Sequence, residues 1–377
     1  MNLNDRIENY LQKRKEAHLF RQLTINQALV DFSSNDYLGF SRSAFIKQQV
    51  DIEYNTLKFT KNGATGSRLL NGNSLLFEEL EQLLAETHHS EAALLFNSGF
   101  DANVGLISTV VRPNDVIFYD ELVHASIHQG MQLSGAKLVA FLHNDMVDLE
   151  EKLKLKAVGQ IGFIITESLF SMEGDMPDLQ KLADLASNYE VELIIDEAHS
   201  TGLFGSNGAG LCNVASIEAK CFARVYTFGK AIASHGAVVL GSKKLKEYLV
   251  NFSKPFIYST ALDKHNLLSV KHSYLYLQNT INQQIKLNKL IFYFKNKFDS
   301  LKSKFSLIGD GPIFGILVLG NENCRKIANY LQKNGLDIRP IIAPTVPIGT
   351  ERLRIILHSY NTTEEIDLLF NLLTDYQ

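Results

Sequence analysis

Seven short apolar runs occupy the middle of the chain, and helical patterns separate most of them. Within each run the hydrophobic residues are continuous rather than alternating, which is typical of strands that are covered on both faces. Strands separated by helices are joined by crossover connections, so their sheet is largely parallel. We therefore predict an α/β fold whose large domain holds a mostly parallel, seven-stranded sheet. Strands are expected at residues 92–96, 115–120, 137–142, 161–166, 191–196, 222–228 and 236–241.

The last third of the chain follows a different pattern. A long helical stretch, 263–301, leads to two short strands with a helix between them, and a final helix opens with the capping-box pattern Thr362-x-x-Glu365. The inward face of that helix is expected to consist of Ile366, Leu369, Phe370 and Leu373. We predict three parts: an N-terminal helix-and-strand segment, a large domain and a small C-terminal α+β domain, at 1–45, 46–264 and 265–377.

The composition of this 377-residue chain disfavours several classes of function. Its 37 basic and 41 acidic residues give a net charge of −4, which argues against nucleic acid or an anionic membrane as an electrostatic partner. No apolar run approaches the roughly 18 residues of a membrane span, and the N-terminus lacks a signal-peptide core. Three widely spaced cysteines form neither a disulfide framework nor a zinc pattern. We expect a cytoplasmic protein.

Lys230 directly follows the apolar run 222–228 and precedes a stretch rich in Gly, Ala and Ser. Open α/β sheets bind ligands at the carboxyl ends of their strands. Burial there would lower the pKa of a lysine and favour a neutral, nucleophilic amine. Small neighbours leave room for a ring. The pattern indicates a lysine that holds a cofactor; the alternative is an ordinary solvated lysine.

Asp196 ends the run 191–196, and His199 follows three residues later. A carboxylate at the end of a buried strand needs a positive partner, and the protonated pyridine nitrogen of pyridoxal phosphate is one. In this interpretation Asp196 holds that proton and His199 lies near the phenolic oxygen of the ring. The alternatives are an ordinary loop and a metal site formed by Asp196, Glu197 and His199.

Ser98, Gly99 and Phe100 stand where the run 92–96 passes into a helical pattern. The free N–H groups and the dipole at a helix start suit a dianion such as phosphate, and Gly99 lets the backbone come close. Thr227 can add a hydroxyl to the same phosphate. An ordinary turn is the alternative for this segment.

His124 follows the run 115–120, again at the carboxyl end of a strand. A histidine there is either a hydrogen-bonded structural residue or, in a pyridoxal phosphate site, an imidazole stacked on the ring. It would also serve as a general acid toward a thioester carbonyl. Each of the four signals is ambiguous alone, but together, at the strand ends of one sheet, they favour a pyridoxal phosphate enzyme.

Ten segments of the chain carry a resemblance to a known family, and they extend over nearly its whole length. They are SSNDYLGF, ATGSRLLNGN, NSGFDAN, ELVHAS, TESLFSMEGD, IIDEAHSTGLFG, TFGKAIASHGA, PFIYSTAL, IRPIIAPTVPIGTERLRI and TTEEID. In these the chain resembles the α-oxoamine synthases, pyridoxal phosphate enzymes of fold type I. That family joins an amino acid to an acyl thioester with loss of CO2, without a metal.

The resemblance implies a role for each cofactor contact. Lys230 is the Schiff-base lysine, Asp196 the partner of the pyridine nitrogen, and His124 the residue stacked on the ring. Further ring contacts are His199 and Ser171. The phosphate contacts are Ser98, Gly99, Phe100 and Thr227, with Ser259 and Thr260 reaching over from the other subunit of a homodimer with shared active sites.

The resemblance also implies the substrates. Arg339 matches the arginine that binds the amino acid's carboxylate, as a bidentate guanidinium does well. Asn35 and Thr345 match the substrate region, and Arg21 the neighbourhood of the far carboxylate of a pimeloyl chain. The stretches GSRLLNGN and PTVPIGTERLR favour L-alanine and a pimeloyl thioester, carried by coenzyme A or an acyl carrier protein.

Two other kinds of function stay open at this point. Within the family, the chain could use glycine with an acetyl thioester, or serine with a long-chain one. It could also be an inactive partner subunit that keeps the fold for assembly, but such a subunit would lack the cofactor lysine, and Lys230 is present.

Overall fold

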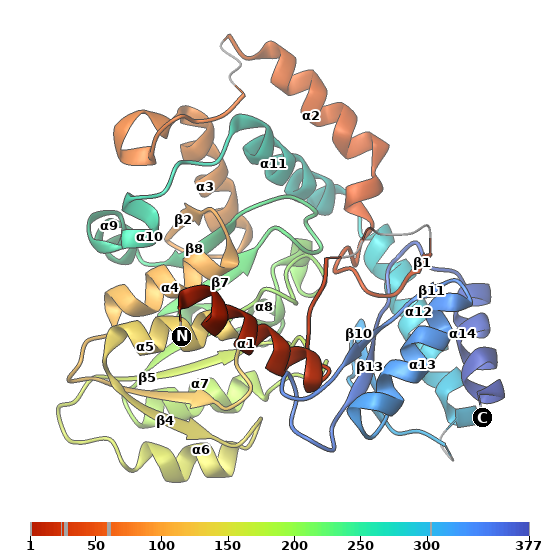
Figure 1. Cartoon of the computed structure of the whole chain (residues 1–377). Helices are drawn as coiled ribbons and strands as arrows, with labels where there is room; N and C mark the ends of the chain where they lie inside the picture. Colours follow the sequence, from red (N-terminus) through yellow and green to blue (C-terminus); the bar gives the residue numbers. More distant parts are fainter. Residues whose placement is uncertain (1, 24, 26–28, 59–61, 302–303, 377) are drawn as a thin grey trace.

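The large sheet has seven strands in the order β2-β8-β7-β6-β5-β3-β4 (Figure 1). The computed structural model describes every residue except 1, 24, 26–28, 59–61, 302–303 and 377. Strand β8 runs antiparallel to β2 and β7, and all other neighbours are parallel. The predicted sheet is confirmed to within one residue at each strand end: β2 (Ala92–Phe96), β3 (Val116–Asp120), β4 (Lys137–Phe141), β5 (Gly162–Glu167), β6 (Glu192–Asp196), β7 (Ala223–Thr227) and β8 (Ala237–Gly241).

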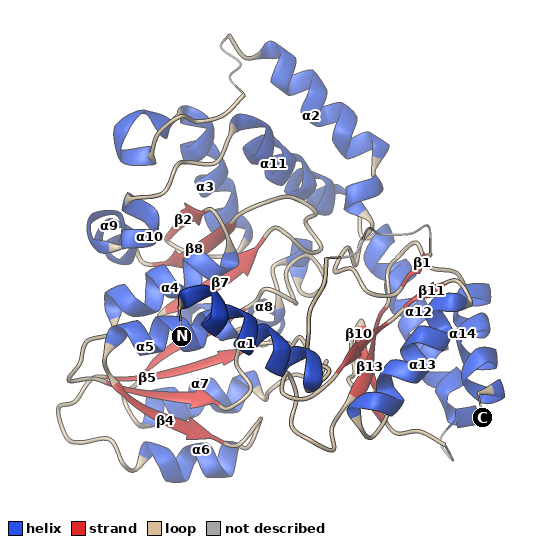
Figure 2. Ribbon diagram, in the orientation of Figure 1, coloured by secondary structure: helices blue, strands red, loops and turns tan. Residues whose placement is uncertain are grey.

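Helices cover both faces of this sheet, which explains why its strands are apolar throughout (Figure 2). Along β5, Phe163 and Ile165 pack into one apolar layer and Ile164 into the opposite one. The first layer is formed with α4 (Gly99–Val110), α5 (Ala125–Ser134), α9 (Lys243–Phe252) and α10 (Lys254–Ile257), the second with α6 (Met146–Leu153), α7 (Leu179–Asn188) and α8 (Leu211–Val214). Among the helices of the described residues, none has the length and apolar character to cross a membrane.

The C-terminal part forms a second, antiparallel sheet in the order β12-β13-β10-β9. Its strands are β9 (Leu307–Ile308), β10 (Ile313–Leu317), β12 (Arg339–Ile341) and β13 (Arg352–Ile356). The helices α12 (Asn282–Phe298), α13 (Asn321–Lys333) and α14 (Thr363–Asp375) lie beside it (Figure 1). This arrangement of an antiparallel sheet and helices confirms the α+β fold predicted for the C-terminal part.

The N-terminal segment joins both parts. Helix α1 (Leu3–Glu16) has no buried residue, and β1 (Val30–Asp31) pairs in parallel with β11 (Leu336–Asp337) of the C-terminal part. One apolar cluster contains Leu95 of the large sheet as well as Leu353 of the small one. It is covered by α2 (Ala44–Thr56), α3 (Leu75–Thr87) and α11 (Lys264–Asn279). Because one apolar core spans both parts, it does not mark where one domain ends and the next begins. The domain boundaries near residues 45 and 264 stay predictions.

The capping box of α14 provides a test of local folding. Thr362 accepts a hydrogen bond from the Glu365 N–H, Glu365 accepts one from the Thr362 N–H, and the four predicted inward residues are buried. We expect Thr362→Ala to lower the free energy of unfolding by about 1 kcal/mol. The adjacent Thr363→Ala should change it by less than half as much, as measured by urea denaturation. Equal losses in the two variants would contradict the capping role.

Candidate active site

Charged side chains gather where the central parallel strands end. Glu167 and Asp196 are the last residues of β5 and β6 and are paired across the two strands. Lys230 follows β7, and both carboxyls act on it electrostatically. His124 follows β3 and interacts with Asp196 and Lys230. The structure thus brings together the ends of β3, β6 and β7, three of the four strand ends on which the sequence interpretation depends, and adds the end of β5.

Lys230 has the properties of a reactive amine. Its side chain is partly buried, and burial lowers its pKa to about 8, although Asp196 and Glu167 oppose this shift. Its ε-amino group has no hydrogen bond to any residue that the structure describes. A large fraction of this amine is therefore neutral near pH 8 and able to attack an aldehyde.

Asp196 and Glu167 form a buried pair of carboxyl groups. Asp196 accepts hydrogen bonds from the Asn103 side-chain amide at 2.7 Å and from the Ala198 N–H at 2.8 Å. Burial and the neighbouring Asp196 raise the pKa of Glu167 well above its usual range. A proton on Glu167 relieves the repulsion between the two groups, so the pair can present one negative charge to a pyridinium nitrogen.

His124 presents an exposed ring beside this pair. Its backbone N–H donates to Glu167 at 2.7 Å, and its Nδ1 lies 2.8 Å from the Ser126 hydroxyl and accepts from the Ser126 N–H at 3.2 Å. Partial loss of hydration of the imidazole lowers its pKa, which favours the neutral ring. With Nδ1 as an acceptor, the proton of the neutral ring lies on Nε2.

His199 is buried and connects the site to Asn35. Its Nδ1 lies 2.7 Å from the Tyr37 hydroxyl, which donates to the Asn35 side-chain oxygen at 3.2 Å. Burial lowers the pKa of His199 well below its usual range, and Lys230 and Arg354 lower it further. The residue is held as a neutral ring with a fixed orientation.

The predicted phosphate contacts also lie together. Ser98 caps α4 by accepting from the Asp101 N–H at 3.0 Å, which leaves the first N–H groups of the helix free to bind an anion. A Cβ added to Gly99 would lie 3.4 Å from the Thr227 hydroxyl oxygen, so the glycine backbone and Thr227 are neighbours. Phe100 is the next residue of the helix.

Ser259 and Thr260 lie near the same strand end. The Thr260 carbonyl accepts from the Asn97 side-chain amide at 2.8 Å. Both residues line a small pocket with Asn97, Arg68 and Phe256. Their contact with the phosphate of a partner subunit stays a prediction.

The predicted substrate residues fall into two groups. Asn35 lies inside the buried network just described. Arg339 is exposed, and its Nε lies 2.7 Å from a carboxylate oxygen of Asp337. Arg21 and Thr345 line one pocket of about 240 Å³ between the end of α1 and the segment after β12, to which Arg325 also contributes.

Arg354 is a site residue that the sequence interpretation missed. It is the cross-strand partner of Arg339 in β12 and β13. Its Nε donates to the Ser171 carbonyl at 2.7 Å, one terminal nitrogen lies 3.3 Å from the Asn35 oxygen, and its charge acts on Lys230. The sequence does contain a signal for Arg354, because it is a charged residue inside the apolar run RLRII.

The alternative metal site does not have converging ligands. Glu197 accepts from the N–H groups of Leu211 and Cys212 and from the Ser168 hydroxyl, while His199 binds Tyr37. Across the described residues, no group of three His, Cys, Asp or Glu side chains is arranged to hold a metal ion. Glu197 therefore supports the backbone behind the site.

The chemistry of this donor set fits pyridoxal phosphate. A reactive amine lies near a buried carboxyl pair that suits a pyridinium nitrogen. The exposed His124 ring offers a stacking surface, and the start of α4 offers a phosphate cradle. Fold and site together define a pyridoxal phosphate enzyme of fold type I.

Comparison with known proteins gives the family. Residues 27–372 match the family aminotransferase class I and II. The chain is 38% identical to 8-amino-7-oxononanoate synthase of Emericella nidulans over 97% of this chain and 93% of that protein. The crystal structure of the same enzyme from Francisella tularensis matches with a TM-score of 0.79 at 29% identity, covering 93% and 98% of the two chains. Serine palmitoyltransferase of S. paucimobilis shares the fold, with a TM-score of 0.89 at 23% identity over 99% and 97%.

The chain therefore belongs to the aminotransferase class I and II family and, within it, to the pyridoxal phosphate-dependent α-oxoamine synthases.

The lowered pKa of Lys230 predicts when the cofactor can attach. The rate at which apoprotein forms a covalent adduct with pyridoxal phosphate should rise with pH through about 8, well below the roughly 10.4 of free lysine. Stopped-flow absorbance across pH 6.5 to 10.5 measures this rate, with borohydride trapping at position 230 as a check. A rate that continues to rise beyond pH 10 would show that Lys230 is not perturbed.

Proposed function

We propose that this enzyme condenses L-alanine with a pimeloyl thioester and releases 8-amino-7-oxononanoate, CO2 and the free thiol, a step of biotin biosynthesis. Two features support the proposal. One is the cluster that Lys230 and Asp196, at the strand ends of the large sheet, form with Arg354 of β13. The other is the similarity to relatives that are named 8-amino-7-oxononanoate synthase, at 38% and 34% identity over nearly the whole chain.

Pyridoxal phosphate, when bound, supplies an electron-accepting ring for the electron pair released at the substrate Cα. Lys230 would hold it through its ε-amino group, and Asp196 would hold the proton on the pyridine nitrogen. His124 would cover one ring face, with His199 and Ser171 at its edge. The phosphate contacts would be Ser98, Gly99, Phe100 and Thr227, together with Ser259 and Thr260 of the second subunit of a homodimer.

With its ε-amino group free, Lys230 would be the base of the reaction. Its lowered pKa leaves it neutral in a large fraction of molecules, so it can take the proton from the alanine Cα. Asn103 orients the Asp196 carboxylate by a hydrogen bond of 2.7 Å. His124 has its Nε2 proton directed away from the Ser126 contact, so it can donate to the thioester carbonyl oxygen.

Two arginines face each other across β12 and β13 and define where a carboxylate would bind. Arg339 and Arg354 are directly opposite, and like charges in that position repel each other. A substrate carboxylate between them would offset this repulsion. We assign its main contact to Arg354, because Arg354 is the one in the Lys230 network, while Arg339 is paired with Asp337.

The acyl donor would enter from the side of α1. The pocket that Arg21 and Thr345 share lies there, and Arg21 would meet the far carboxylate of the pimeloyl chain. Coenzyme A and an acyl carrier protein both deliver the chain on a phosphopantetheine arm, so the geometry is compatible with either.

An assay of substrate choice tests the proposal. Purified protein is incubated with alanine, glycine or serine and with pimeloyl, acetyl or palmitoyl thioesters on both carriers, and ketone product and CO2 are measured. We expect turnover with alanine and a pimeloyl thioester. A clear preference for glycine with acetyl, or serine with palmitoyl, would contradict the proposal while keeping the family.

Loss of the lysine should abolish this turnover. Lys230→Ala is expected to lose at least the roughly 10²–10⁴-fold that a general base supplies, and more because the attachment is lost as well. The matched control is Lys244→Ala, at an exposed lysine of α9, which should retain wild-type kcat. Near-normal turnover of the Lys230 variant would refute its role.

A matched pair of substitutions distinguishes the roles of Arg339 and Arg354. Lysine keeps the charge but not the bidentate geometry. Arg354→Lys should raise the KM for alanine by roughly 10- to 100-fold, as expected for a lost charged hydrogen bond of about 1.5–3 kcal/mol. Arg339→Lys should also raise the KM for alanine, but the change in the logarithm of KM should be less than half of that caused by Arg354→Lys. The reverse order would assign the carboxylate to Arg339.

A further inference from the structure

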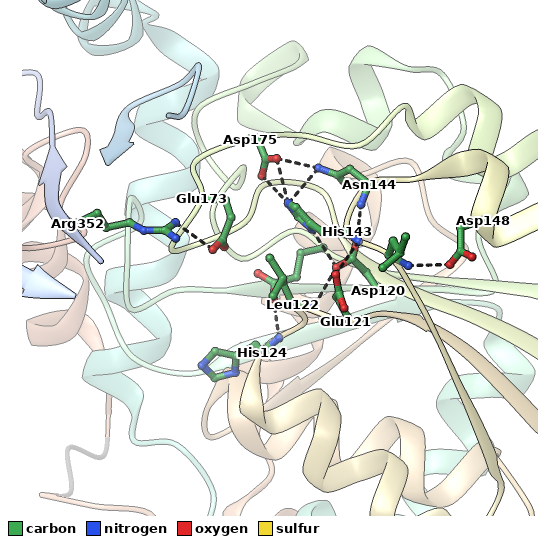
Figure 3. Close-up of polar contacts among 12 residues, drawn as sticks. Asp120, Glu121, Leu122, His124, His143, Asn144, Asp148, Glu173, Asp175 and Arg352 are labelled. Atoms are coloured by element: carbon green, nitrogen blue, oxygen red, sulfur yellow. Dashed lines mark hydrogen bonds and ion pairs between the residues drawn. The ribbon is translucent and has the colours of Figure 1, made fainter. Parts of the chain in front are cut away.

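His143 lies in a polar cluster that has no part in the chemistry described so far (Figure 3). Its Nδ1 lies 3.0 Å from Asp120, the last residue of β3, and its Nε2 lies 3.0 Å from Asp175. Asn144 adds two bonds, from its N–H to Asp120 at 2.8 Å and from its side-chain amide to Asp175 at 3.0 Å. The imidazole thus bridges two carboxylates from separate parts of the chain.

The Asp120 end of this bridge and the imidazole ring itself are held in place. Asp120 is fully buried and also accepts from the Leu122 N–H at 2.9 Å. The ring of His143 packs edge-on against the buried Phe170, with 4.4 Å between the ring centres. The ring cannot rotate without breaking both ion pairs and this contact.

The cluster keeps the imidazole charged. Burial alone would lower the pKa of His143, but hydrogen bonds to Asp120 and Asp175 raise it to about 10. Both ring nitrogens therefore carry protons at neutral pH, and each donates to one carboxylate. A neutral histidine can donate from only one of them, so the bridge depends on the charged form.

The bridge holds one end of a tight turn, residues 170–175, which follows β5. The turn is closed by hydrogen bonds from the Phe170 N–H to the Asp175 carbonyl at 3.0 Å and from the Gly174 N–H to the Phe170 carbonyl at 2.9 Å. Its outer side faces the small sheet. There the Ser171 carbonyl accepts from Arg354 at 2.7 Å.

The same turn also receives the second arginine of β13. Arg352 donates to the Met172 carbonyl and to the Glu173 carboxylate, both at 3.1 Å, and its side chain is 5% exposed (Figure 3). The turn is therefore attached to β13 by two guanidinium groups, Arg352 and Arg354.

On the side that faces β10, the turn is in close contact with the backbone of that strand. Gly174 has φ +71°, and a Cβ added to it would lie 2.2 Å from the Ile313 carbonyl oxygen. The Gly174 carbonyl accepts from the Asp310 N–H at 3.0 Å. A shift of the turn would therefore press on β10, the neighbour of β13 in the small sheet, and would move the Ser171 carbonyl that binds Arg354.

We propose that His143 is a positioning residue for amino acid recognition: by bridging Asp120 and Asp175 it fixes the 170–175 turn, and the turn fixes the direction of Arg354. The inference rests on the proposed function, since it assigns the carboxylate of the amino acid substrate to Arg354. His143 acts through Asp175 and the turn; its own side-chain contacts are with Asp120, Asp175, Asn144 and Phe170.

Asp175→Ala tests this without disturbing the buried end of the bridge. It removes the partly exposed carboxylate and leaves the pair between Asp120 and His143 in place. We expect the KM for alanine to rise by roughly 5- to 20-fold, about one lost charged hydrogen bond, with kcat within about threefold and the KM for the thioester unchanged. In the apoprotein, amide hydrogen exchange over 170–175 should become faster.

Two further variants complete the experiment. Asp175→Asn keeps an acceptor for His143 and should restore part of the affinity for alanine. Asp184→Ala removes a surface ion pair with Lys220 of 3.0 Å on α7 and is the matched control with wild-type kinetics. If Asp175→Ala behaves like the control, or if it lowers stability and raises both KM values equally, the positioning role is wrong.

The affinity of the wild-type holoenzyme for alanine, from the change in cofactor absorbance, separates the two proposals. A wild-type protein that responds to no amino acid overturns the proposed function and the inference that rests on it. A wild-type protein that responds normally, with an unchanged Asp175→Ala variant, overturns the inference alone.

Discussion

The pairing of Glu167 with Asp196 across neighbouring strands is the interaction on which the site depends. Two buried carboxylates side by side would be strongly unfavourable if both were charged, because each loses its hydration and they repel each other. The fold resolves this with a raised pKa at Glu167, hydrogen bonds from Asn103 and the His124 backbone, and the nearby Lys230 amine. The same arrangement leaves one negative charge for a cationic heterocycle, while burial, against the effect of the two carboxyls, lowers the pKa of Lys230.

A second constraint couples the two sheets. The 170–175 turn begins at the end of β5 and receives both arginines of β13, so the strand ends of the large sheet and the substrate side of the small sheet share one structural element. The residues proposed to hold the cofactor follow strands of the large sheet, whereas Arg339 and Arg354 come from the small one. The reaction requires a fixed distance between the residues of the large sheet and the arginines of the small sheet. The buried ion pair between Arg352 and Glu173 helps to keep this distance.

The sequence was sufficient for the sheet because two-sided burial leaves a local signature. Each strand is an apolar run, and Asp196, Lys230 and His124 could be singled out because they follow such runs directly. Glu167 carries the same signal, but the predicted strand was ended one residue too early, at Thr166. Arg354 and Asn35 meet across 319 positions of sequence, and Tyr37 meets His199 across 162. Such contacts are set by tertiary packing, and neither spacing nor composition indicates them.

The reversal between β7 and β8 has a consequence for the lysine. The two strands are antiparallel, so the segment that carries Lys230 is anchored on both sides: Phe228 and Gly236 are hydrogen-bonded at 2.9 Å, and the Lys230 carbonyl accepts from the Ala233 N–H at 2.8 Å. Its main chain has no freedom to travel with the amine. The part that remains free to move is the side chain, with its four methylene groups. In the proposed enzyme, the cofactor aldehyde would then be captured and released by motion of the Lys230 side chain, with the main chain of this segment held in place.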